Sequence, residues 1–362
     1  MDNNRRGKTF GSSHIFENII SLENLFIAWK EFKRGKTKKQ DVQKFEMFLE
    51  DNLFRLHGEL KQKTYRHSNY TDFYIKDPKL RHIHKAEVRD RVVHHAIYRI
   101  LYPIFDKSFI YDSYSCRDGK GTHGAVLRLE SFARKASKNF TKTCYCLKCD
   151  IKKFFNSIDH QILLDLIRKK ITDEDDLWLL EEIIKSFGKD AGKGLPLGNL
   201  TSQLFANIYL DELDKFIKHR LRARYYLRYT DDFIIVHQDK NYLKDLIPEI
   251  DKFLRQDLKL DLHPEKITIR KLRQGLDFLG YVVLPHYRTL RTKTKKRMFK
   301  KLKVKQVQFY SGEISAETFE QVRRSYLGIL SHCSSSKLRE EIVLCQTIDL
   351  AWLRQCELRT RY

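Results

Sequence analysis

Two adjacent carboxylates interrupt a run of strand-forming residues in the segment RYTDDFIIVH, residues 228–237. Asp231 and Asp232 lie between the runs YYLRY and FIIV, so the simplest local geometry is a hairpin that carries both carboxylates at its tip. Aspartate also favours turns for conformational reasons alone. The pair by itself therefore leaves two interpretations open, a turn residue and a chemical site.

A third carboxylate, Asp150, ends another strand-like run, CYCLKCD, and a helix-like segment follows it directly. Beside the hairpin tip, this side chain would complete a cluster of hard oxygen ligands. Such like charges would raise one another's pKa values unless a divalent cation lay among them. Two Mg²⁺ ions in this site could activate a 3′-hydroxyl and stabilise a leaving pyrophosphate. This chemistry suggests a nucleic-acid polymerase or a nuclease.

The charge of the whole chain agrees with a polyanionic partner. The 362 residues include 70 Lys and Arg against 47 Asp and Glu, a net charge of +23 that exceeds what solubility requires. Nucleic acid is the favoured partner, and a solvated basic surface or a peripheral membrane protein are the alternatives. The polar start MDNNRRGKTFGSSH has no signal-peptide pattern, and no long apolar span follows, so we expect an intracellular protein without a membrane partner.

The seven cysteines do not predict a disulfide framework, since an odd number in a chain of this length favours a reducing compartment. The tightest group, Cys144, Cys146 and Cys149, has a spacing that resembles metal ligands. On a regular strand, however, the first two side chains face one side and the third faces the other. We therefore do not expect a zinc site there.

The elements that must position the carboxylates follow from hydrophobic spacing. A helix is predicted after a Ser21 cap, and a second apolar stripe runs from Val42 through Phe45, Phe48 and Leu49 to Leu53. The basic turn KRGKTKK between them is either a solvated loop or an RNA contact. From about residue 70, strand-like runs alternate with helical stretches, which indicates an α+β or α/β core. The strand-like runs are TDFYIKD, CYCLKCD, YYLRY, FIIVH and ITIRK, and the helical stretches are 86–101, 159–170 and 201–221.

A strongly basic segment follows the mixed region. Residues 288–305, RTLRTKTKKRMFKKLKVK, contain ten Lys or Arg and no acid. A charge run is usually a solvated face, but in a chain already short of acids we favour a nucleic-acid contact. We expect this segment to begin a separate helical and basic unit that continues to Tyr362.

The order of the motifs resembles that of reverse transcriptases. CDIKKFFNSI, GLPLGNLTSQLFANIYL, RYTDD, HPEKITI and LDFLGY look like motifs A to E, and PKLRHIHKAEVRDRVVHHAI resembles the fingers motif of the group II intron and bacterial branch. The resemblance covers roughly residues 70–285, and five motifs in order are more specific than any one. It implies an α+β right-hand polymerase of cytoplasmic location and bacterial, archaeal or phage origin. Its parts would be an N-terminal helical extension (1–70), fingers and palm with a small antiparallel sheet (71–285), and a basic helical thumb (286–362).

The resemblance also implies a role for each acid. Asp150 and Asp231 would bind both catalytic Mg²⁺ ions, with Asp232 beside them. The backbone carbonyl of Ile151 would be a further metal ligand.

Nucleotide-binding residues are implied in the same way. Phe155 has the position of an aromatic steric gate under the sugar of the incoming nucleotide, which would select dNTPs, although a core position is the alternative. Arg81 matches the fingers arginine that grips the triphosphate, and Lys76 or Lys79 would supply a second cation. Lys266 matches the motif D lysine proposed to protonate the leaving pyrophosphate.

Motif B departs from the common pattern. Most reverse transcriptases have a glutamine before its glycine and a proline after its serine, whereas this chain has Leu197 before Gly198 and Gln203 after Ser202. Together with DSYSCRDGKGTHGA at 112–125, these changes resemble the reverse transcriptases of diversity-generating retroelements. Those enzymes copy a template RNA into cDNA with errors concentrated at adenines, assisted by a small basic accessory protein that oligomerises.

An aliphatic side chain at 197 cannot donate the hydrogen bond that the glutamine gives to the incoming nucleotide in accurate relatives, so discrimination should fall. The alternative is that Leu197 only packs. The implied partners are template RNA, the RNA/cDNA duplex, dNTPs and the accessory protein. A stand-alone antiphage defence enzyme or another bacterial reverse transcriptase is the alternative function, and a non-catalytic RNA-binding scaffold is a third. The thumb residues expected to contact nucleic acid are Arg291, Lys293, Lys295, Lys296, Arg297, Lys300 and Lys301.

Overall fold

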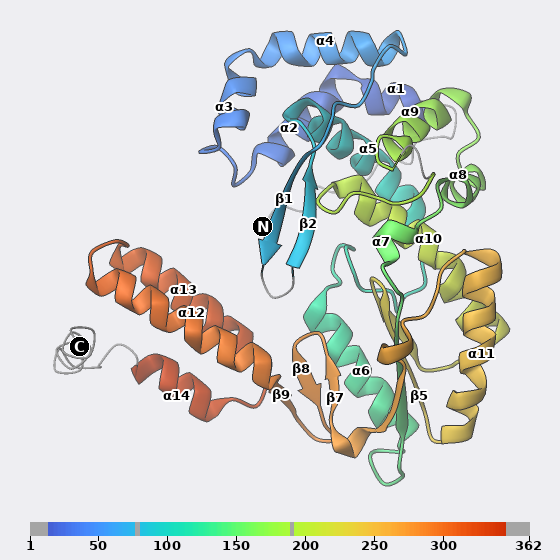
Figure 1. Ribbon diagram of the computed structural model, residues 1–362, viewed down its shortest axis with the longest axis vertical. Coiled ribbons are helices and arrows are strands. Elements are labelled where there is room, and N and C mark those ends of the chain that lie inside the picture. Colours follow the sequence, from blue (N-terminus) through green and yellow to red (C-terminus); the bar gives the residue numbers. More distant parts are fainter. Residues whose placement is uncertain (1–13, 77–79, 189–191, 345–362) are drawn as a thin grey trace. The chain divides into compact units, whose positions relative to one another are not determined.

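The structure of the chain is a computed structural model, which describes residues 14–76, 80–188 and 192–344 (Figure 1). Lys79 therefore lies outside the described residues. The described chain forms two compact units. Unit 1 contains the chain up to Gly121, Lys148–Ile235 and Asn241–Thr268, and unit 2 contains Thr122–Leu147, Val236–Lys240 and the chain from Ile269 onwards. The three-part division predicted from the motifs, with boundaries after residues 70 and 285, stays a prediction.

Helices make up most of unit 1. They are α1 (Ile15–Ile20), α2 (Leu22–Lys33), α3 (Gln40–Met47), α4 (Leu49–Lys61), α5 (Val88–Asp106), α7 (Phe154–Ser157), α8 (His160–Arg168), α9 (Glu174–Lys185), α10 (Leu200–Lys215) and α11 (Lys240–Asp257), with a π-helix η3 (Phe216–Arg220) and a 3₁₀ turn η4 (Pro264–Lys266). Helices α2 and α10 both pack against α5. Because α10 is buried on most of its surface, it forms the centre of the unit rather than an amphipathic cover.

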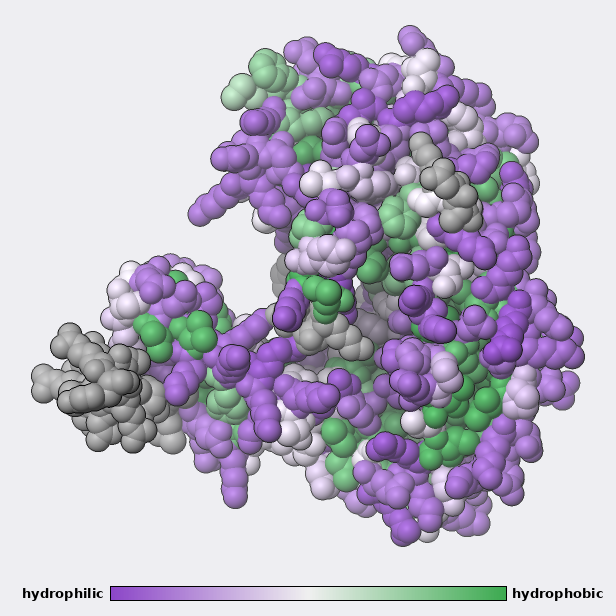
Figure 2. All heavy atoms as spheres, in the orientation of Figure 1, coloured by the Kyte–Doolittle hydropathy of each residue, from purple (hydrophilic) through white to green (hydrophobic). Residues whose placement is uncertain are grey.

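The N-terminal prediction is confirmed at α2, where the Ser21 hydroxyl accepts a hydrogen bond from the backbone N–H of Asn24 at 3.2 Å. The second apolar stripe differs from the prediction. The chain leaves helical geometry at Phe48, with φ −126° and ψ 46°, and so forms two helices, α3 and α4. The break turns Phe48 away from the core, and its side chain is 60% exposed. Figure 2 shows an apolar patch over this junction, where Met47 and Phe48 are exposed.

Three small sheets carry the strands. β1 (Thr71–Lys76) and β2 (Leu80–Lys85) form an antiparallel hairpin, and β7 (Leu276–Phe278), β8 (Tyr281–Val283) and β9 (Arg288–Leu290) form an antiparallel sheet. The third sheet has the order β4-β5-β3-β6, with β3 at Tyr145–Asp150, β4 at Tyr226–Tyr229, β5 at Asp232–His237 and β6 at Thr268–Lys271. These strands lie where the strand-like runs predicted them, and the mixture confirms the α+β class.

Unit 2 contains α6 (Thr122–Ala136), the 3₁₀ turn η5 (Leu272–Gln274), α12 (Thr292–Tyr310), α13 (Ala316–Leu330) and α14 (Ser336–Leu344). Helices α12 and α13 lie side by side, with the rings of Phe309 and Phe319 stacked at 5.4 Å (Figure 1). The basic segment is therefore helical, as predicted. In α12 only Met298 and Leu302 are buried among the residues described. No helix in the described part of the chain is long and apolar enough to span a membrane.

Candidate active site

The three carboxylates come together at one end of the central sheet. Asp150 is the last residue of β3, and Asp232 is the first residue of the neighbouring strand β5. Strands β4 and β5 pair antiparallel, with Tyr229 opposite Asp232, so Asp231 lies in the hairpin turn as predicted. The backbone N–H of Ile151 donates to the carbonyl of Asp231 at 3.3 Å. This bond ties the end of β3 directly to the hairpin tip.

A second segment fixes the other side of the β3 end. Ile151 forms an isolated antiparallel bridge with Leu262. The bridge is made by its neighbours: His263 N–H donates to the Asp150 carbonyl at 2.8 Å, and Lys152 N–H donates to the Asp261 carbonyl at 2.9 Å. The carbonyl of Ile151 is therefore not used by the bridge itself. Bonds on both sides hold the backbone that carries Asp150, which preorganises its side chain.

Two lysines contact the acids. Lys266 Nζ, in η4, donates to Asp150 Oδ1 at 2.6 Å, and Lys148 Nζ lies 3.7 Å from Asp232 Oδ1. Lys148 precedes Asp150 by two residues on β3, so both side chains point to the same face of that strand. The structure thus brings Lys266 into contact with the acidic cluster, and its role as a proton donor stays a prediction.

Burial and mutual repulsion shape the protonation of the cluster. Burial, followed by the charge of Asp150, raises the pKa of Asp231 to about 6. Burial also raises the pKa of Asp232, while Lys148 opposes this change. These carboxylates therefore lie in a site that disfavours uncompensated negative charge, which is the condition that favours a bound cation.

The donor set fits hard divalent cations, since three carboxylates and a backbone carbonyl are the oxygen ligands that Mg²⁺ prefers. As they stand, however, no three His, Cys, Asp or Glu side chains in the described ranges are grouped so that they could hold a metal ion. Asp150 directs one oxygen to Lys266 instead. A cation that bound Asp150 Oδ1 would therefore have to replace that lysine contact.

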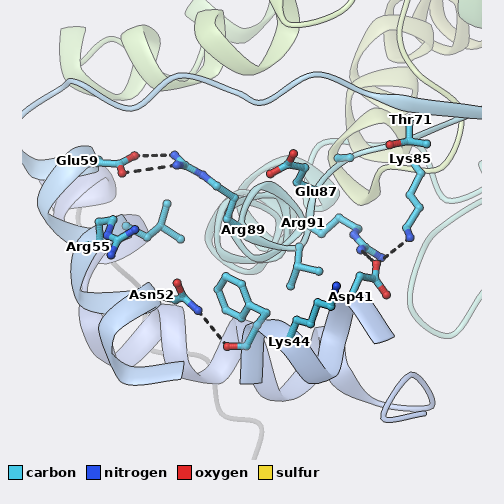
Figure 3. A pocket seen from close by; sticks show the side chains of 14 residues that line it. Asp41, Lys44, Asn52, Arg55, Glu59, Thr71, Lys85, Glu87, Arg89 and Arg91 are labelled. Atoms are coloured by element: carbon cyan, nitrogen blue, oxygen red, sulfur yellow. Dashed lines mark hydrogen bonds and ion pairs between the residues drawn. The ribbon is translucent and has the colours of Figure 1, made fainter. Parts of the chain in front are cut away.

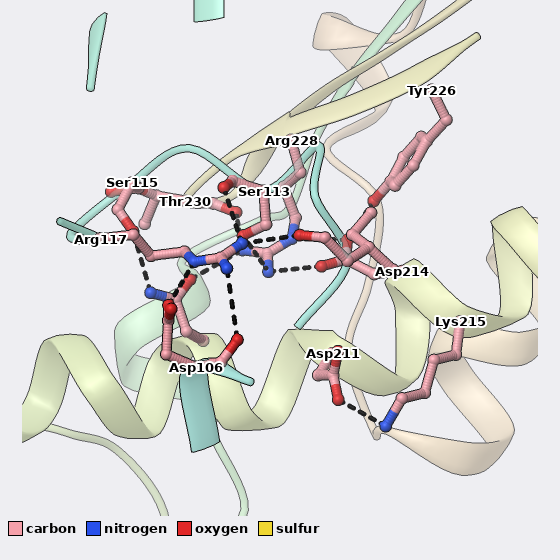
Figure 4. Close-up of polar contacts among 12 residues, drawn as sticks. Asp106, Ser113, Ser115, Arg117, Asp211, Asp214, Lys215, Tyr226, Arg228 and Thr230 are labelled. Atoms are coloured by element: carbon pink, nitrogen blue, oxygen red, sulfur yellow. Dashed lines mark hydrogen bonds and ion pairs between the residues drawn. The ribbon is translucent and has the colours of Figure 1, made fainter. Parts of the chain in front are cut away.

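Arg228 supports the hairpin turn. Its role was not predicted from the sequence, although it lies in the motif RYTDD. Its guanidinium is 1% exposed and donates to both carboxylate oxygens of Asp214, each at 2.7 Å (Figure 4). The same group donates to the carbonyl of Thr230 at 3.0 Å and to the hydroxyl of Ser113 at 3.1 Å. Thr230 has φ +55°, an uncommon conformation for a β-branched residue. Arg228 therefore fixes the turn immediately before Asp231.

The loop 112–115 is bound to the same arginine. Backbone hydrogen bonds join Arg228 N–H to the Asp112 carbonyl at 3.0 Å and Tyr114 N–H to the Arg228 carbonyl at 2.9 Å. The hydroxyl of Thr230 also donates to that of Ser115 at 2.7 Å. The segment DSYSCRD thus reaches the hairpin turn through both backbone and side chains. No sequence pattern predicted this contact.

Phe155 lies close to the carboxylates along the chain, in α7. Its neighbour Phe154 is buried, whereas Phe155 is half-buried, and their rings meet edge to face at 5.3 Å. The carbonyl of Phe155 accepts a hydrogen bond from Leu195 N–H at 2.7 Å. Phe154 therefore fills the core position, and Phe155 is linked to the start of the loop that contains Leu197.

The loop with Leu197 and Gly198 is anchored at several points. Leu197 is half-buried, its carbonyl accepts from His84 N–H at 3.3 Å, and Gly198 has φ +124°, a conformation that favours glycine. The next residue, Asn199, is 3% exposed and donates from Nδ2 to His94 Nε2 at 3.0 Å and to the Tyr70 hydroxyl at 3.3 Å.

His94 is the buried centre of this second network. Since Nε2 accepts from Asn199, its Nδ1–H donates to the Thr201 hydroxyl at 2.7 Å. Burial, followed by the charge of His67, lowers the pKa of His94 well below its ordinary value, so the ring is neutral and can accept this bond. Tyr70, His94 and Asn199 were not singled out in the sequence, because nothing in their spacing joins them.

The other predicted nucleotide-binding residues lie at the surface. Lys76 and Arg81 are exposed on the β1–β2 hairpin, where Arg81 stands opposite Ile75. Gln203 is exposed on α10, one residue after the buried Ser202. Within the described part of the chain, no hydrogen bond or ion pair joins any of these three side chains to the acids, so their roles stay predictions.

The predicted nucleic-acid-binding residues lie on or beside α12. Arg291 precedes the helix and pairs with Asp277, and Lys295 lies 5.9 Å from the ring centre of Phe299. The exposed residues of the set are Lys293, Lys296, Arg297, Lys300 and Lys301. They form a basic surface on the helix, and their contact with nucleic acid stays a prediction.

Comparisons with known proteins found several similar chains. Two relatives are protein YkfC of Escherichia coli, 27% identical over 56% of this chain and 63% of that protein, and the group II intron-encoded protein LtrA of Lactococcus lactis, 26% identical over 65% of this chain and 50% of that protein. The chain thus spans about half to two thirds of the length of these relatives. A solved structure of apo telomerase from Candida tropicalis, truncated from its C-terminal domain, is similar with a TM-score of 0.47 and 16% identity, over 62% of this chain and 55% of that one.

The chain also matches a protein family. Residues 75–283 match the family described as reverse transcriptase (RNA-dependent DNA polymerase). This range is more than half of the 362 residues and contains all three clustered carboxylates and Lys266. The chain therefore belongs to the reverse transcriptase family.

Proposed function

We propose that this chain is an RNA-directed DNA polymerase that copies a template RNA into cDNA by two-metal nucleotidyl transfer. We further propose that it does so with errors at template adenines, as part of a diversity-generating retroelement. The observation that carries the first proposal is the convergence of Asp150, Asp231 and Asp232 at the end of β3 and the tip of the β4–β5 hairpin. In a member of the reverse transcriptase family, this cluster is the expected site of bond formation.

Asp150 and Asp231, with Asp232 and the carbonyl of Ile151, are the groups that would hold two Mg²⁺ ions. Such ions favour ionisation of a primer 3′-hydroxyl and neutralise a leaving pyrophosphate. Lys266 contacts Asp150 at 2.6 Å, so its ammonium lies beside the group that carries the chemistry. Released from that carboxylate, Lys266 would be free to donate a proton to the pyrophosphate.

Nucleotide selection is assigned to the residues around the cluster. Phe155 would lie under the sugar and exclude a 2′-hydroxyl, and this role is supported because Phe154, rather than Phe155, occupies the core. Arg81, with Lys76 or Lys79, would bind the triphosphate. Gly198 and Gln203 would complete the pocket beside Leu197.

The proposal of low fidelity depends on Leu197. Its side chain is half-buried in a loop held by His84 and Asn199, so the loop is fixed while the side chain offers no hydrogen bond to a nucleotide. A pocket that recognises the base pair by shape alone discriminates less between correct and incorrect nucleotides than one that also makes a polar contact. The diversity-generating assignment, including a small basic oligomeric accessory protein, depends on this residue, on Gln203 and on the segment 112–125.

The basic face of α12 would contact the phosphates of the template RNA and of the RNA/cDNA duplex. Five exposed cations on this helix favour such a contact, and its strength would fall steeply with salt. The protein would act in the cytoplasm of a bacterium or archaeon, or of a cell infected by a phage that encodes it.

The test is magnesium-dependent extension of a primer on a defined RNA template, with dNTPs or NTPs, followed by sequencing of the products. Asp231→Asn serves as the inactive control because it keeps the size of the side chain and removes its charge. DNA synthesis by the wild type that is lost in Asp231→Asn supports the polymerase. Extension that is equal in both proteins would contradict the assignment of the cluster.

The fidelity proposal has its own comparison. Leu197→Gln should lower misincorporation opposite template adenine, while errors opposite the other bases change less. An error spectrum that is the same in wild type and Leu197→Gln would remove Leu197 from the explanation. Accurate copying by the wild type would instead favour a defence enzyme or another bacterial reverse transcriptase.

A further inference from the structure

A second pocket lies in unit 1 among the N-terminal helices and the start of α5. Its volume is about 490 Å³, and its walls come from α3, α4, the ends of the β1–β2 hairpin and the first turn of α5 (Figure 3). The carboxylates of the candidate active site do not line it. A volume of this size is within the range of sites for small organic molecules, about 300 to 1,000 Å³.

The pocket is basic and partly prearranged by ion pairs. Asp41 accepts from Lys85 at 2.7 Å and from Arg91 at 2.6 Å, and Glu59 accepts from Arg89 at 2.6 Å. Burial acts to raise the pKa of Asp41, but the hydrogen bonds from Lys85 and Arg91 prevail and hold it at about 2. These pairs keep three cations on one wall in fixed positions.

Two further cations line the pocket without a partner of this kind. Lys44, on α3, and Arg55, on α4, are exposed, and no hydrogen bond or ion pair joins either of them to another residue of the described ranges. Five cations and three acids line the pocket in total, so its net charge is positive. Since Lys44 and Arg55 have no acidic partner among the residues that the structure describes, their charges are available to an anionic ligand.

The remaining lining supplies an aromatic surface. Phe45 is half-buried, packs against Trp29 with ring centres 5.2 Å apart, and still lines the pocket next to the buried Leu56. A ring supported by a second ring is a rigid platform for a planar group. Aromatic platforms flanked by cations are the common means of binding single-stranded nucleic acid, because every base has a π-face.

We propose that this pocket holds one unstacked nucleotide of a single-stranded RNA, with the base against Phe45 and the flanking phosphates on Lys44 and Arg55. The inference rests on the proposed function in so far as the chain is taken to bind RNA. The site is separate from the acids that would join nucleotides, so it would hold RNA without taking part in the reaction.

The test is equilibrium binding of a fluorescent single-stranded RNA to the full chain, measured over a range of salt concentrations. The variant is Lys44→Gln/Arg55→Gln. The matched control is Lys30→Gln/Lys61→Gln, which removes the same charge from two exposed lysines that do not line the pocket. Each lost phosphate contact should lower the slope of log K against log salt by about 0.7 for a single strand, so the variant should lose about 1.4. Its affinity near 0.1 M salt should fall on the order of tenfold, and the control should change little.

A base-dependent measurement completes the test. Phe45→Leu should weaken binding of the RNA but not of a strand that carries abasic sites throughout, since only the former has a base to stack. Equal losses in the pocket variant and the control would overturn the proposal in favour of general electrostatic attraction. Competition by a free mononucleotide as effective as the RNA itself would also overturn it, because the pocket would then be a site for the free nucleotide.

The inference and the proposed function fail in different ways. A chain that binds RNA with the expected dependence on Lys44 and Arg55, yet makes no DNA, would retain the pocket and lose the polymerase. A chain that makes DNA while the pocket variant and the control bind RNA equally would retain the polymerase and lose the pocket.

Discussion

Replacement of Arg228 by methionine should destabilise the protein and inactivate the site together. The arginine is 1% exposed and Asp214 is fully buried, so Arg228→Met leaves a buried carboxylate whose charge is no longer balanced. Tyr226 would still donate to Asp214 Oδ1 at 2.6 Å, but a phenol carries no positive charge. The acceptors at Thr230 and Ser113 would also lose their donor.

The magnitude follows from these contacts. Breaking a buried, hydrogen-bonded ion pair by removing one partner costs about 3 to 5 kcal/mol. Total stabilities of domains are about 5 to 15 kcal/mol, so Arg228→Met should remove about a fifth or more of the free energy of unfolding. Arg228→Lys should recover only part of the loss, because an ammonium cannot donate to both oxygens of Asp214 and to Thr230 in the arrangement that the planar guanidinium provides.

Denaturant unfolding and primer extension, measured on the same preparations, separate stability from geometry. The double variant Asp214→Leu/Arg228→Met removes both charges and should recover much of the stability, since apolar pairs of similar volume often replace buried ion pairs without loss. It should not recover activity, because Thr230 and the loop 112–115 still lack the guanidinium. Full activity in the folded double variant, or a stability of Arg228→Met equal to wild type, would refute this reasoning.

Three other perturbations follow from contacts already described. Burial, followed by the charges of Asp173 and Asp175, raises the pKa of Asp176 to about 7, so the folded state keeps a proton that the unfolded chain releases near pH 4. The free energy of unfolding should therefore fall as pH rises from about 4 to 7, by at most about 4 kcal/mol. Asp176→Asn should abolish this decline, measured by urea unfolding across that pH range. A decline that persists in the variant would show that another group causes it. Lys266→Gln should lower the Mg²⁺ concentration needed for half-maximal extension, because a cation would no longer displace an ammonium from Asp150. It should also lower the maximal rate, because the proposed proton donor to pyrophosphate is lost. An unchanged Mg²⁺ titration would contradict competition between the cation and Lys266. Asn199→Ala removes the amide donor to His94 Nε2, costs about 0.5 to 1.5 kcal/mol, and should raise KM for dNTPs more than Ser186→Ala, which removes one partner of Tyr70 and none of His94. Equal KM values in the two variants would show that this network does not act on the nucleotide pocket.

The sequence was sufficient for the parts of the site that depend on local pattern. Strand-like runs predicted β1, β3, β4, β5 and β6, and the interruption of one run by two acids predicted the hairpin turn that contains Asp231. The strand-end position of Asp150 was predicted for the same reason. Family membership agrees with the right-hand polymerase class that the order of the motifs implied.

The parts that escaped prediction depend on contacts between distant segments. Arg228 looks like an ordinary strand residue until Asp214, on α10, is seen beside it. Tyr70, His94 and Asn199 come from three segments and meet only in the folded unit. Phe48 was assigned to a buried stripe because spacing cannot reveal that the helix breaks at this residue. Residue types predict local geometry, whereas hydrogen-bond partners, ion-pair partners and breaks within helices depend on tertiary packing.

The three cysteines of the segment CYCLKCD have a practical consequence for experiments on this protein. Cys144, Cys146 and Cys149 are buried, so alkylating reagents and oxidants cannot reach their sulfur atoms in the folded state. Cys116 is exposed, and it lies in the loop that contacts the hairpin turn through Ser113 and Ser115. A fluorophore attached to Cys116 would therefore report on this loop during catalysis. The three buried thiols would react with alkylating reagents only after unfolding, so their modification would measure the unfolded fraction.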